Sequence, residues 1–399
     1  CWLGQALLGY VAFQALNPGW EYRTDGIGWW VRELPGIAWL PKSVQAPFDL
    51  GGPWRMLMIG ATVWLTVCSL WVGFTRRRTL QTLLVAVSVN GVALAVLGIA
   101  QKLLPNGKIF WLWAPPRDAA MFASFIYKNH AGAYLVLGLC ATCGLAGWYY
   151  LRGLRRLEKS NPAGVLAFFA TGIGIAVLVS YARGATIVML GFLTLCVAGF
   201  VIHQLFSTSN NRKPVVAVVL ILIFGYFLKT GLESLTTTEA WSRLQRGVSG
   251  QDGSLQSRGQ ATKATLDMAR ASWPMGAGAG SFRFLFPLYQ QHYPEIFMLN
   301  GRRMVWENAH NDPVQIVAEL GLPGCLLLAA SLGYLLVALL RNFAWQNPLS
   351  GAVALCLGFV AIYSWWDFPF QNPAILILWW TLAVAAVMWS GFEERNVKG

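Results

Sequence analysis

The chain has 399 residues, of which 56% are hydrophobic and only 12% are charged, with a formal net charge of +13. Soluble proteins carry roughly 25% charged residues, so this composition indicates a protein embedded in a bilayer. Nucleic-acid binding is not indicated, because the Lys and Arg residues are scattered among loops and form no basic domain or binding motif. Membrane topology, anionic lipids or a phosphorylated substrate account for the positive charge instead.

Apolar segments of near-membrane length recur along the whole chain, and we predict about ten transmembrane helices from them. Continuous apolar runs favour helices over strands, whose side chains would alternate. Cys1 already lies inside an apolar run, so we expect that further chain, with one or more spans, precedes it. The predicted spans are residues 1–16, 56–74, 80–101, 129–151, 164–181, 185–206, 214–230, 313–340, 349–364 and 373–390.

Basic residues of the short loops fall on one side of the membrane if these spans alternate, and the positive-inside rule makes that side cytoplasmic. They are Arg76, Arg77, Arg78, Arg152, Arg155, Arg156, Lys159, Arg212, Lys213, Arg341, Arg395 and Lys398. The other side then holds residues 17–55, 102–128, 182–184, 231–312 and 365–372. We expect short helices in the large loop 231–312, for example around 257–272.

The predicted fold class is therefore all-α: a polytopic transmembrane bundle with one large extracytoplasmic loop that bears short helices. We divide the chain into N-terminal spans with a Trp-rich loop (1–115), a membrane domain that includes loop 231–312 (116–390), and a cytoplasmic tail (391–399). No internal repeat is evident, so the inverted repeats of secondary transporters are not indicated.

The junction around His310 is the most informative part of the sequence. A polar loop meets an apolar segment after Asp312, so His310 is predicted to lie at the membrane surface, with Gln315 and Glu319 one and two turns further along a helix. Ionisable groups at that depth are costly and are functional candidates by default.

Arginines provide a second set of candidates. Arg183 stands in a very short break between two apolar runs, where its guanidinium either snorkels to lipid headgroups or binds a phosphate through its planar fork. Cations outnumber acids in loop 231–312, and we expect most of them to form a solvated face. Arg258 and Arg303 stand out there because each lies near a recognisable motif.

Lys128, Asn129 and His130 stand at the extracytoplasmic start of a predicted span. His130 is a second acid or base, a substrate ligand, or a capping and packing residue. Asp367, in the last extracytoplasmic loop, either orients a base or has a structural role. The chain has no HExxH, no DxD and no carboxylate cluster, so we predict no metal site and no cofactor.

Several of these segments, taken in order, resemble the motifs of the O-antigen ligase / O-antigen polymerase (Wzy-C-like) family of polytopic membrane glycosyltransferases. The segments are Phe125–Gly132, Ser180–Ala185, Ser257–Arg258 followed by the glycine run Pro274–Phe282 and Tyr289, and Asn308–Gly324. The tripeptide before Gly184 is Tyr-Ala-Arg, where Ser-Arg or Gly-Ser-Arg is commoner in the family. The resemblance covers about residues 120 to 390 and leaves 1–115 unexplained. From the residues themselves, the glycine run indicates a tight turn with close backbone approach.

The resemblance implies a GT-C-like enzyme of the bacterial inner membrane. Such an enzyme transfers a glycan from an undecaprenyl-diphosphate-linked donor to an acceptor hydroxyl on the periplasmic side. The resemblance also implies that His310 is the base. It implies that Arg183 and Arg258 are the cations on the diphosphate, where negative charge builds as the anomeric bond breaks. Asn311 or Glu319 then orients the base, no metal is required, and direct displacement inverts the anomeric carbon. The implied substrate-binding residues are Arg303, Asn129, His130, Asn311, Glu319 and Lys128.

The acceptor remains open, because ligases, polymerases and protein O-oligosaccharyltransferases of this family share the motifs. The acceptor is lipid A core, another glycan, or a Ser or Thr of a protein. In a different class, a secondary transporter would use Glu319, Arg183 and His310 as a proton or anion relay, with charges at the membrane midplane. A structural or assembly protein would not need Arg and His residues gathered on one side of the membrane.

Overall fold

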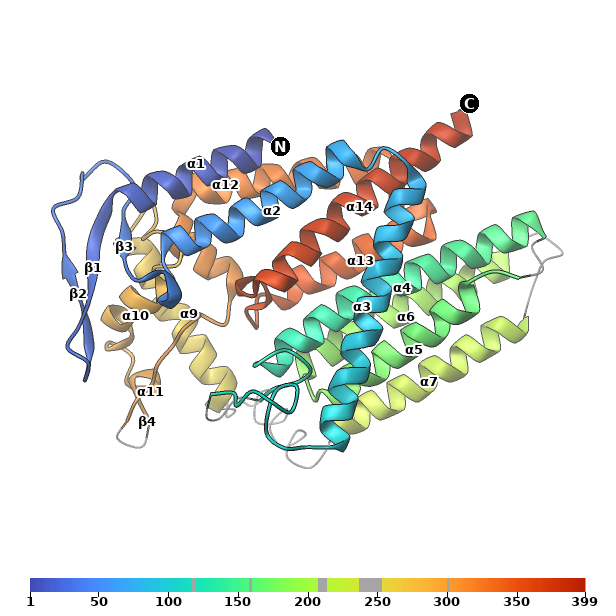
Figure 1. Ribbon diagram of the computed structural model, residues 1–399, viewed down its shortest axis with the longest axis horizontal. Helices are drawn as coiled ribbons and strands as arrows, with labels where there is room; N and C mark the ends of the chain where they lie inside the picture. Colours follow the sequence, from blue (N-terminus) through green and yellow to red (C-terminus); the bar gives the residue numbers. More distant parts are fainter. Residues whose placement is uncertain (117–119, 158–159, 207–213, 237–252, 300–301, 399) are drawn as a thin grey trace. The chain divides into compact units, whose positions relative to one another are not determined.

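The computed structural model describes residues 1–116, 120–157, 160–206, 214–236, 253–299 and 302–398 (Figure 1). The described chain is mostly helical and clusters into two compact units. Unit 1 draws on Cys1–Ser69, Arg243–Val337 and Ser364–Ile377, and unit 2 on Leu70–Ser242, Ala338–Tyr363 and Leu378–Gly399. Both units therefore combine segments that are far apart in the sequence.

The helices are α1 (Trp2–Leu16), α2 (Pro53–Gly73), α3 (Arg77–Leu103), α4 (Lys128–Arg156), α5 (Ala163–Val179), α6 (Arg183–Phe206), α7 (Pro214–Thr236), α9 (Gly253–Ala271), α10 (Phe282–Gln290), α11 (Pro294–Phe297), α12 (Asp312–Arg341), α13 (Pro348–Tyr363) and α14 (Pro373–Lys398). Short 3-10 helices lie at Phe48–Leu50, Ala344–Gln346 and Pro369–Gln371. Each predicted span overlaps one of the α-helices, and α9 is the helix expected around 257–272.

Six helices in the described part of the chain are long and apolar enough to cross a membrane: α2, α3, α4, α6, α12 and α14. Helices α5 and α13 are apolar but shorter, with 17 and 16 residues, below the ~20 residues that a span requires. The predicted count of about ten spans is therefore not shown. The chain is a multi-pass membrane protein with several apolar helices.

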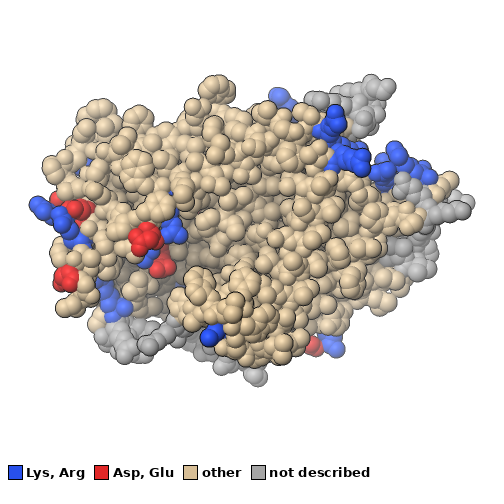
Figure 2. All heavy atoms as spheres, viewed as in Figure 1, with Lys and Arg blue, Asp and Glu red and all other residues tan. Residues whose placement is uncertain are grey.

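Helix α4 lies inside unit 2. Of its most apolar window, 78% is buried, compared with 28% for that of α3. Small residues let its neighbours approach closely, because a Cβ built on Gly132 would lie 2.5 Å from the Cβ of Ala185 and one built on Gly138 would lie 3.6 Å from the Cα of Gly91. In Figure 2, Lys and Arg residues gather where α3 begins and α4 ends. Lys159, Arg212 and Lys213 lie outside the described residues, as do the side chains of Arg395 and Lys398.

Unit 1 contains a small β-sheet that the all-α prediction misses. Its strands β1 (Pro18–Thr24), β2 (Trp29–Glu33) and β3 (Ser43–Gln45) are arranged in the order β2-β1-β3, with β2 antiparallel and β3 parallel to β1. Asp25 closes the β1–β2 turn, where the backbone N–H groups of Gly28 and Ile27 donate to its carboxylate and hold its pKa below the usual value. A second, two-stranded sheet pairs β4 (Met298–Leu299) with β5 (Arg302–Arg303).

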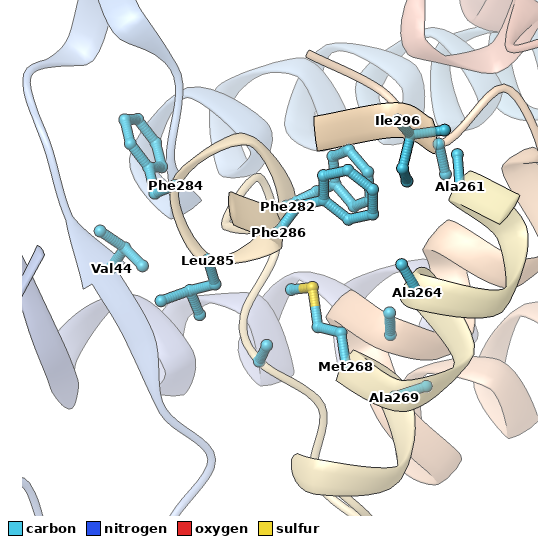
Figure 3. Packing of buried hydrophobic residues seen from close by; sticks show 13 residues of the cluster. Val44, Ala261, Ala264, Met268, Ala269, Phe282, Phe284, Leu285, Phe286 and Ile296 are labelled. Atoms are coloured by element: carbon cyan, nitrogen blue, oxygen red, sulfur yellow. The ribbon is translucent and has the colours of Figure 1, made fainter. Parts of the chain in front are cut away.

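The sheet belongs to a hydrophobic core shared with α9 and α10 (Figure 3). The ring of Phe284 contacts Tyr22 at 5.6 Å and Trp29 at 6.3 Å, so the N-terminal hairpin packs directly on α10. Met268 of α9 and Phe282 of α10 lie in the same cluster and are almost fully buried. The N-terminal segment and loop 253–299 therefore form one core, although more than 200 residues separate them.

Helix α12 is broken at Gly321, whose φ is 59° and ψ is −162°, and Pro323 follows. The glycine run holds this break together, since Ala277 N–H donates to Ala318 O, Gly278 N–H donates to Glu319 O, and Leu322 N–H donates to Pro274 O. A helix terminus leaves carbonyl groups without partners, and these bonds satisfy two of them. The predicted tight turn with close backbone approach is confirmed.

Candidate functional site

His310 lies in the loop that precedes α12, in the left-handed region with φ 54°. Its ring is held between two aromatic side chains, Trp306 at 5.6 Å and Phe368 at 4.5 Å, both edge to face. A histidine in this backbone region costs free energy, and such strain is concentrated at functional sites. The side chain is 25% exposed, so the imidazole combines a fixed orientation with an open edge.

Asp367 is the carboxylate that faces the histidine. Its Oδ1 lies 3.7 Å from His310 Nδ1, and its side chain is only 2% exposed. The separation exceeds that of a hydrogen bond, and His310 Nδ1 is a buried atom without a hydrogen-bond partner in the described chain. The arrangement suits a base that becomes charged, because a buried carboxylate stabilises an imidazolium beside it.

The loop that carries Asp367 is tied to the start of α12 by Asp312. Backbone N–H of Asp312 donates to Ser364 O at 2.9 Å. Its carboxylate accepts from Phe370 N–H at 2.9 Å and from Gln371 Nε2 at 3.1 Å. His310 and Asp367 are thus positioned by one short hydrogen-bonded connection between two segments.

We expect Asp312→Ala to lower the free energy of unfolding by about 2 kcal/mol, because it leaves two donors without their acceptor at a fully buried position. Thermal unfolding of the purified protein in detergent measures the change. Asp49→Ala is the matched control, since Asp49 is an exposed carboxylate of the same unit. Equal melting temperatures for the two variants would contradict the role of Asp312.

Arg258 of α9 reaches the same loop. Its Nη1 donates to Trp366 O at 2.6 Å, one residue before Asp367. Arg258 and His310 are both predicted site residues. Within unit 1, Arg258 contacts Trp366 and His310 faces Asp367, the next residue in the chain. Arg303 lies in β5, is exposed, and holds its guanidinium 5.6 Å from the ring centroid of Phe297.

Glu319 and Asn311 are turned toward the protein. Glu319 Oε1 accepts from Phe282 N–H at 3.1 Å and from Gln315 Nε2 at 3.3 Å. Gln315 Oε1 in turn accepts from Ala309 N–H, next to His310, while Asn311 Oδ1 accepts from Val314 N–H and caps α12. Both residues support the backbone of the histidine loop, whereas the carboxylate opposite the imidazole belongs to Asp367.

A group of cations lies in unit 2 where α3 ends and where α4 and α6 begin. Lys128 is the first residue of α4 and Arg183 the first of α6. Lys128 lies close enough to Arg183 and Lys102 for their charges to repel it. Cations gathered at two helix N-termini create a positive potential that favours an anion. Lys102 was missed from the sequence because it ends a long apolar run.

The residues next to this cation group contact one another through a hydrogen bond and ring contacts. Asn129 Nδ2 donates to the hydroxyl of Tyr127 at 2.7 Å, and the His130 ring meets the Tyr127 ring edge to face at 5.0 Å. Tyr181, two residues before Arg183, adopts φ 54°, and Lys102 Nζ lies 5.7 Å from its ring centroid. The described residues contain no group of three or more His, Cys, Asp or Glu side chains that could hold a metal ion.

Residues 165–329 match the family model described as O-antigen ligase. This segment is an O-antigen ligase domain. It contains Arg183, Arg258, Arg303, His310 and Glu319, while Lys102, Lys128 and Asp367 lie outside it. The O-antigen ligase domain marks the chain as an enzyme of glycosyltransferase type, with glycan transfer of the O-antigen ligase or polymerase kind and lipid-linked glycans as substrates. No curated protein matches the chain significantly.

Proposed function

We propose that the protein transfers a glycan from an undecaprenyl-diphosphate-linked donor to an acceptor hydroxyl at the periplasmic face of the bacterial inner membrane. The observation that carries this proposal is the position of His310 beside the buried Asp367. His310 lies within the O-antigen ligase domain, and Asp367 lies C-terminal to it in the sequence. The reaction is inverting and metal-independent: the acceptor oxygen attacks the anomeric carbon directly, and the lipid diphosphate leaves as an anion.

His310 is the proposed general base. Its Nδ1 faces Asp367, so the opposite nitrogen, Nε2, accepts the proton of the acceptor hydroxyl. Asp367 then stabilises the imidazolium and holds the ring in the required tautomer. Catalytic hydrogen bonds are often long before substrate binds, and the 3.7 Å separation between the two side chains fits that state. Asn311 and Glu319 support the loop that presents the ring.

The family resemblance assigns Arg183 of unit 2 and Arg258 of unit 1 to the leaving group, where charge develops. Within unit 2, the repulsion that Lys128 experiences from Arg183 and Lys102 is relieved when a dianion binds. The guanidinium of Arg183 makes no ion pair within the described part of the chain, which leaves its donors available. Arg303, Asn129 and His130 contact the sugar or the acceptor.

Arg183→Ala is expected to lower transfer by about 100-fold, because a preorganised donor to a developing anion contributes on that scale. Arg183→Lys retains the charge without the fork and is expected to recover part of the activity. Initial rates at several donor concentrations measure both. Lys229→Ala removes an exposed cation of the same unit that pairs with Glu233 and is expected to retain full activity. Equal rates for the Arg183 and Lys229 variants would remove Arg183 from the site.

The function itself is tested with purified protein, an undecaprenyl-diphosphate-linked glycan and EDTA. Three acceptors distinguish the forms of the reaction: lipid A core for a ligase, a second lipid-linked glycan for a polymerase, and a Ser/Thr peptide for a protein O-oligosaccharyltransferase. Transfer to one acceptor supports the proposal and identifies the acceptor. Absence of transfer to all three, with donor binding intact, would overturn it.

A further inference from the structure

The segment between α13 and α14 exposes two adjacent indoles in unit 1. Trp365 is 54% exposed and Trp366 is 58% exposed, whereas every other residue of 363–370 is buried or half-buried. Ser364 and Asp367, on either side of the pair, are buried. The fold thus buries the polar side chains of this segment and leaves its two largest apolar side chains accessible. Apolar surface exposed in this way marks contact with another molecule.

The backbone that carries the indoles is fixed. Ser364 O accepts from Asp312 N–H at 2.9 Å, and Trp366 O accepts from Arg258 Nη1 at 2.6 Å. Trp365 lies between these two anchored residues. A tryptophan that only anchors a helix at the membrane interface has to reach the headgroups, and it does not need an anchored backbone. A fixed pair of indoles is instead preorganised for a ligand.

The indoles lie beside the groups of unit 1 that the proposed reaction uses. Asp367 follows Trp366 at about 3.8 Å between Cα atoms, and it faces His310. Arg258, the cation of this unit in the proposed reaction, is bonded to Trp366 itself. The transferred sugar is bonded to the diphosphate at the carbon that the acceptor attacks. Its ring must therefore lie near both the base and the cation.

We propose that Trp365 and Trp366 form a platform on which the first sugar ring of the donor glycan stacks, an inference that rests on the proposed function. The C–H face of a sugar ring fits the flat apolar face of an indole, and the hydroxyl groups at the rim of the ring stay free for polar partners. His310 and Arg258 act on the acceptor proton and the diphosphate, and the platform adds a contact to the ring itself. The donor ring is the same for a lipid, glycan or protein acceptor.

The kinetic test compares Trp365→Ala/Trp366→Ala with the control Trp39→Ala/Trp345→Ala, which removes two exposed indoles from other segments. The platform predicts that kcat/KM for the donor falls at least about tenfold in the platform variant and stays unchanged in the control. Trp365→Phe/Trp366→Phe keeps two aromatic rings and is expected to recover most of the loss. The Phe variant decides the question if the Ala variant does not fold.

Sugar binding is measured directly on protein that is labelled with fluorotryptophan and reconstituted in nanodiscs. The fluorine NMR resonances of Trp365 and Trp366 are assigned from the two single Trp→Phe variants. The probe is the donor glycan released from its lipid by mild acid. The platform predicts that this glycan shifts both resonances and leaves that of Trp345 unmoved. A nitroxide-labelled lipid in the same nanodiscs broadens the two resonances if the indoles are membrane anchors.

The proposal is overturned if the released glycan moves neither resonance, and broadening by the nitroxide lipid would then make the two indoles membrane anchors. It is also overturned if wild type transfers glycan and the platform variant matches the control in kcat/KM, and the proposed function would then stand. If wild type transfers glycan to no acceptor, the proposed function fails, and the glycan titration alone decides whether the platform binds a sugar.

Discussion

Replacing His310 with Ala is expected to lower glycan transfer by at least about 100-fold while donor binding and folding stay intact. The imidazole is the group that accepts the acceptor proton in the proposed reaction, and neither Asp367 nor Glu319 is placed to replace it. Asp367 is buried and turned to the Nδ1 edge of the ring, and the nearby Glu319 carboxylate is engaged by Phe282 N–H and Gln315. Transfer from an undecaprenyl-diphosphate-linked donor in EDTA measures the effect.

His292→Ala is the matched control for this experiment. His292 belongs to the same unit, is exposed and lies just after α10, so its removal is expected to leave transfer unchanged. Asp367→Asn is expected to reduce transfer less than His310→Ala and to shift the pH dependence of the rate, because it removes the charge opposite the base. Full activity of the His310 variant would show that another group takes the proton.

The sequence is sufficient to predict a mostly helical membrane protein and to single out several residues of the proposed site, because these depend on local patterns. Apolar runs predict the helices, and the polar residues before an apolar run predict the His310 junction. Arg258 was singled out by its motif, and it reaches the carbonyl of Trp366 beside Asp367. The sequence leaves open whether Asp367, Glu319 or Asn311 orients the base, because the answer depends on a connection between residues 312 and 370 that no periodicity indicates.

The N-terminal region is the part of the fold that local patterns did not explain. Residues 17–55 are predicted only as an extracytoplasmic loop, although the Asp25-Gly26 turn between Trp-containing segments is a sequence signal for the β1–β2 hairpin. Its role in unit 1 depends on long-range bonds that the sequence does not indicate. Gln14 of α1 donates to Glu319 O at 3.1 Å and accepts from Ala279 N–H at 3.0 Å, so the first helix helps to hold the break in α12.

That break leads to the largest expected effect on stability. Gly321→Ala is expected to lower the free energy of unfolding by more than about 2 kcal/mol, because a side chain at φ 59° is strained and its Cβ has no space. The Cβ would lie 2.5 Å from the nitrogen of Gly276 and would also meet Pro274 O, and backbone atoms cannot rotate away as a flexible side chain can. Displacing the glycine run would break the bonds that fix Ala318 and Glu319, and with them the helix that carries the His310 loop.

Gly333→Ala provides the control within the same helix. A Cβ at Gly333 meets no atom within 4 Å, so this substitution is expected to be neutral or stabilising, as Ala is the better helix former. Thermal unfolding in detergent and glycan transfer are measured for both variants. We expect Gly321→Ala to lose stability and transfer together, because the residue that fixes the helix break also positions the base. If Gly321→Ala loses stability but its folded fraction transfers glycan at the full rate, the break in α12 has a structural role only and does not position the base.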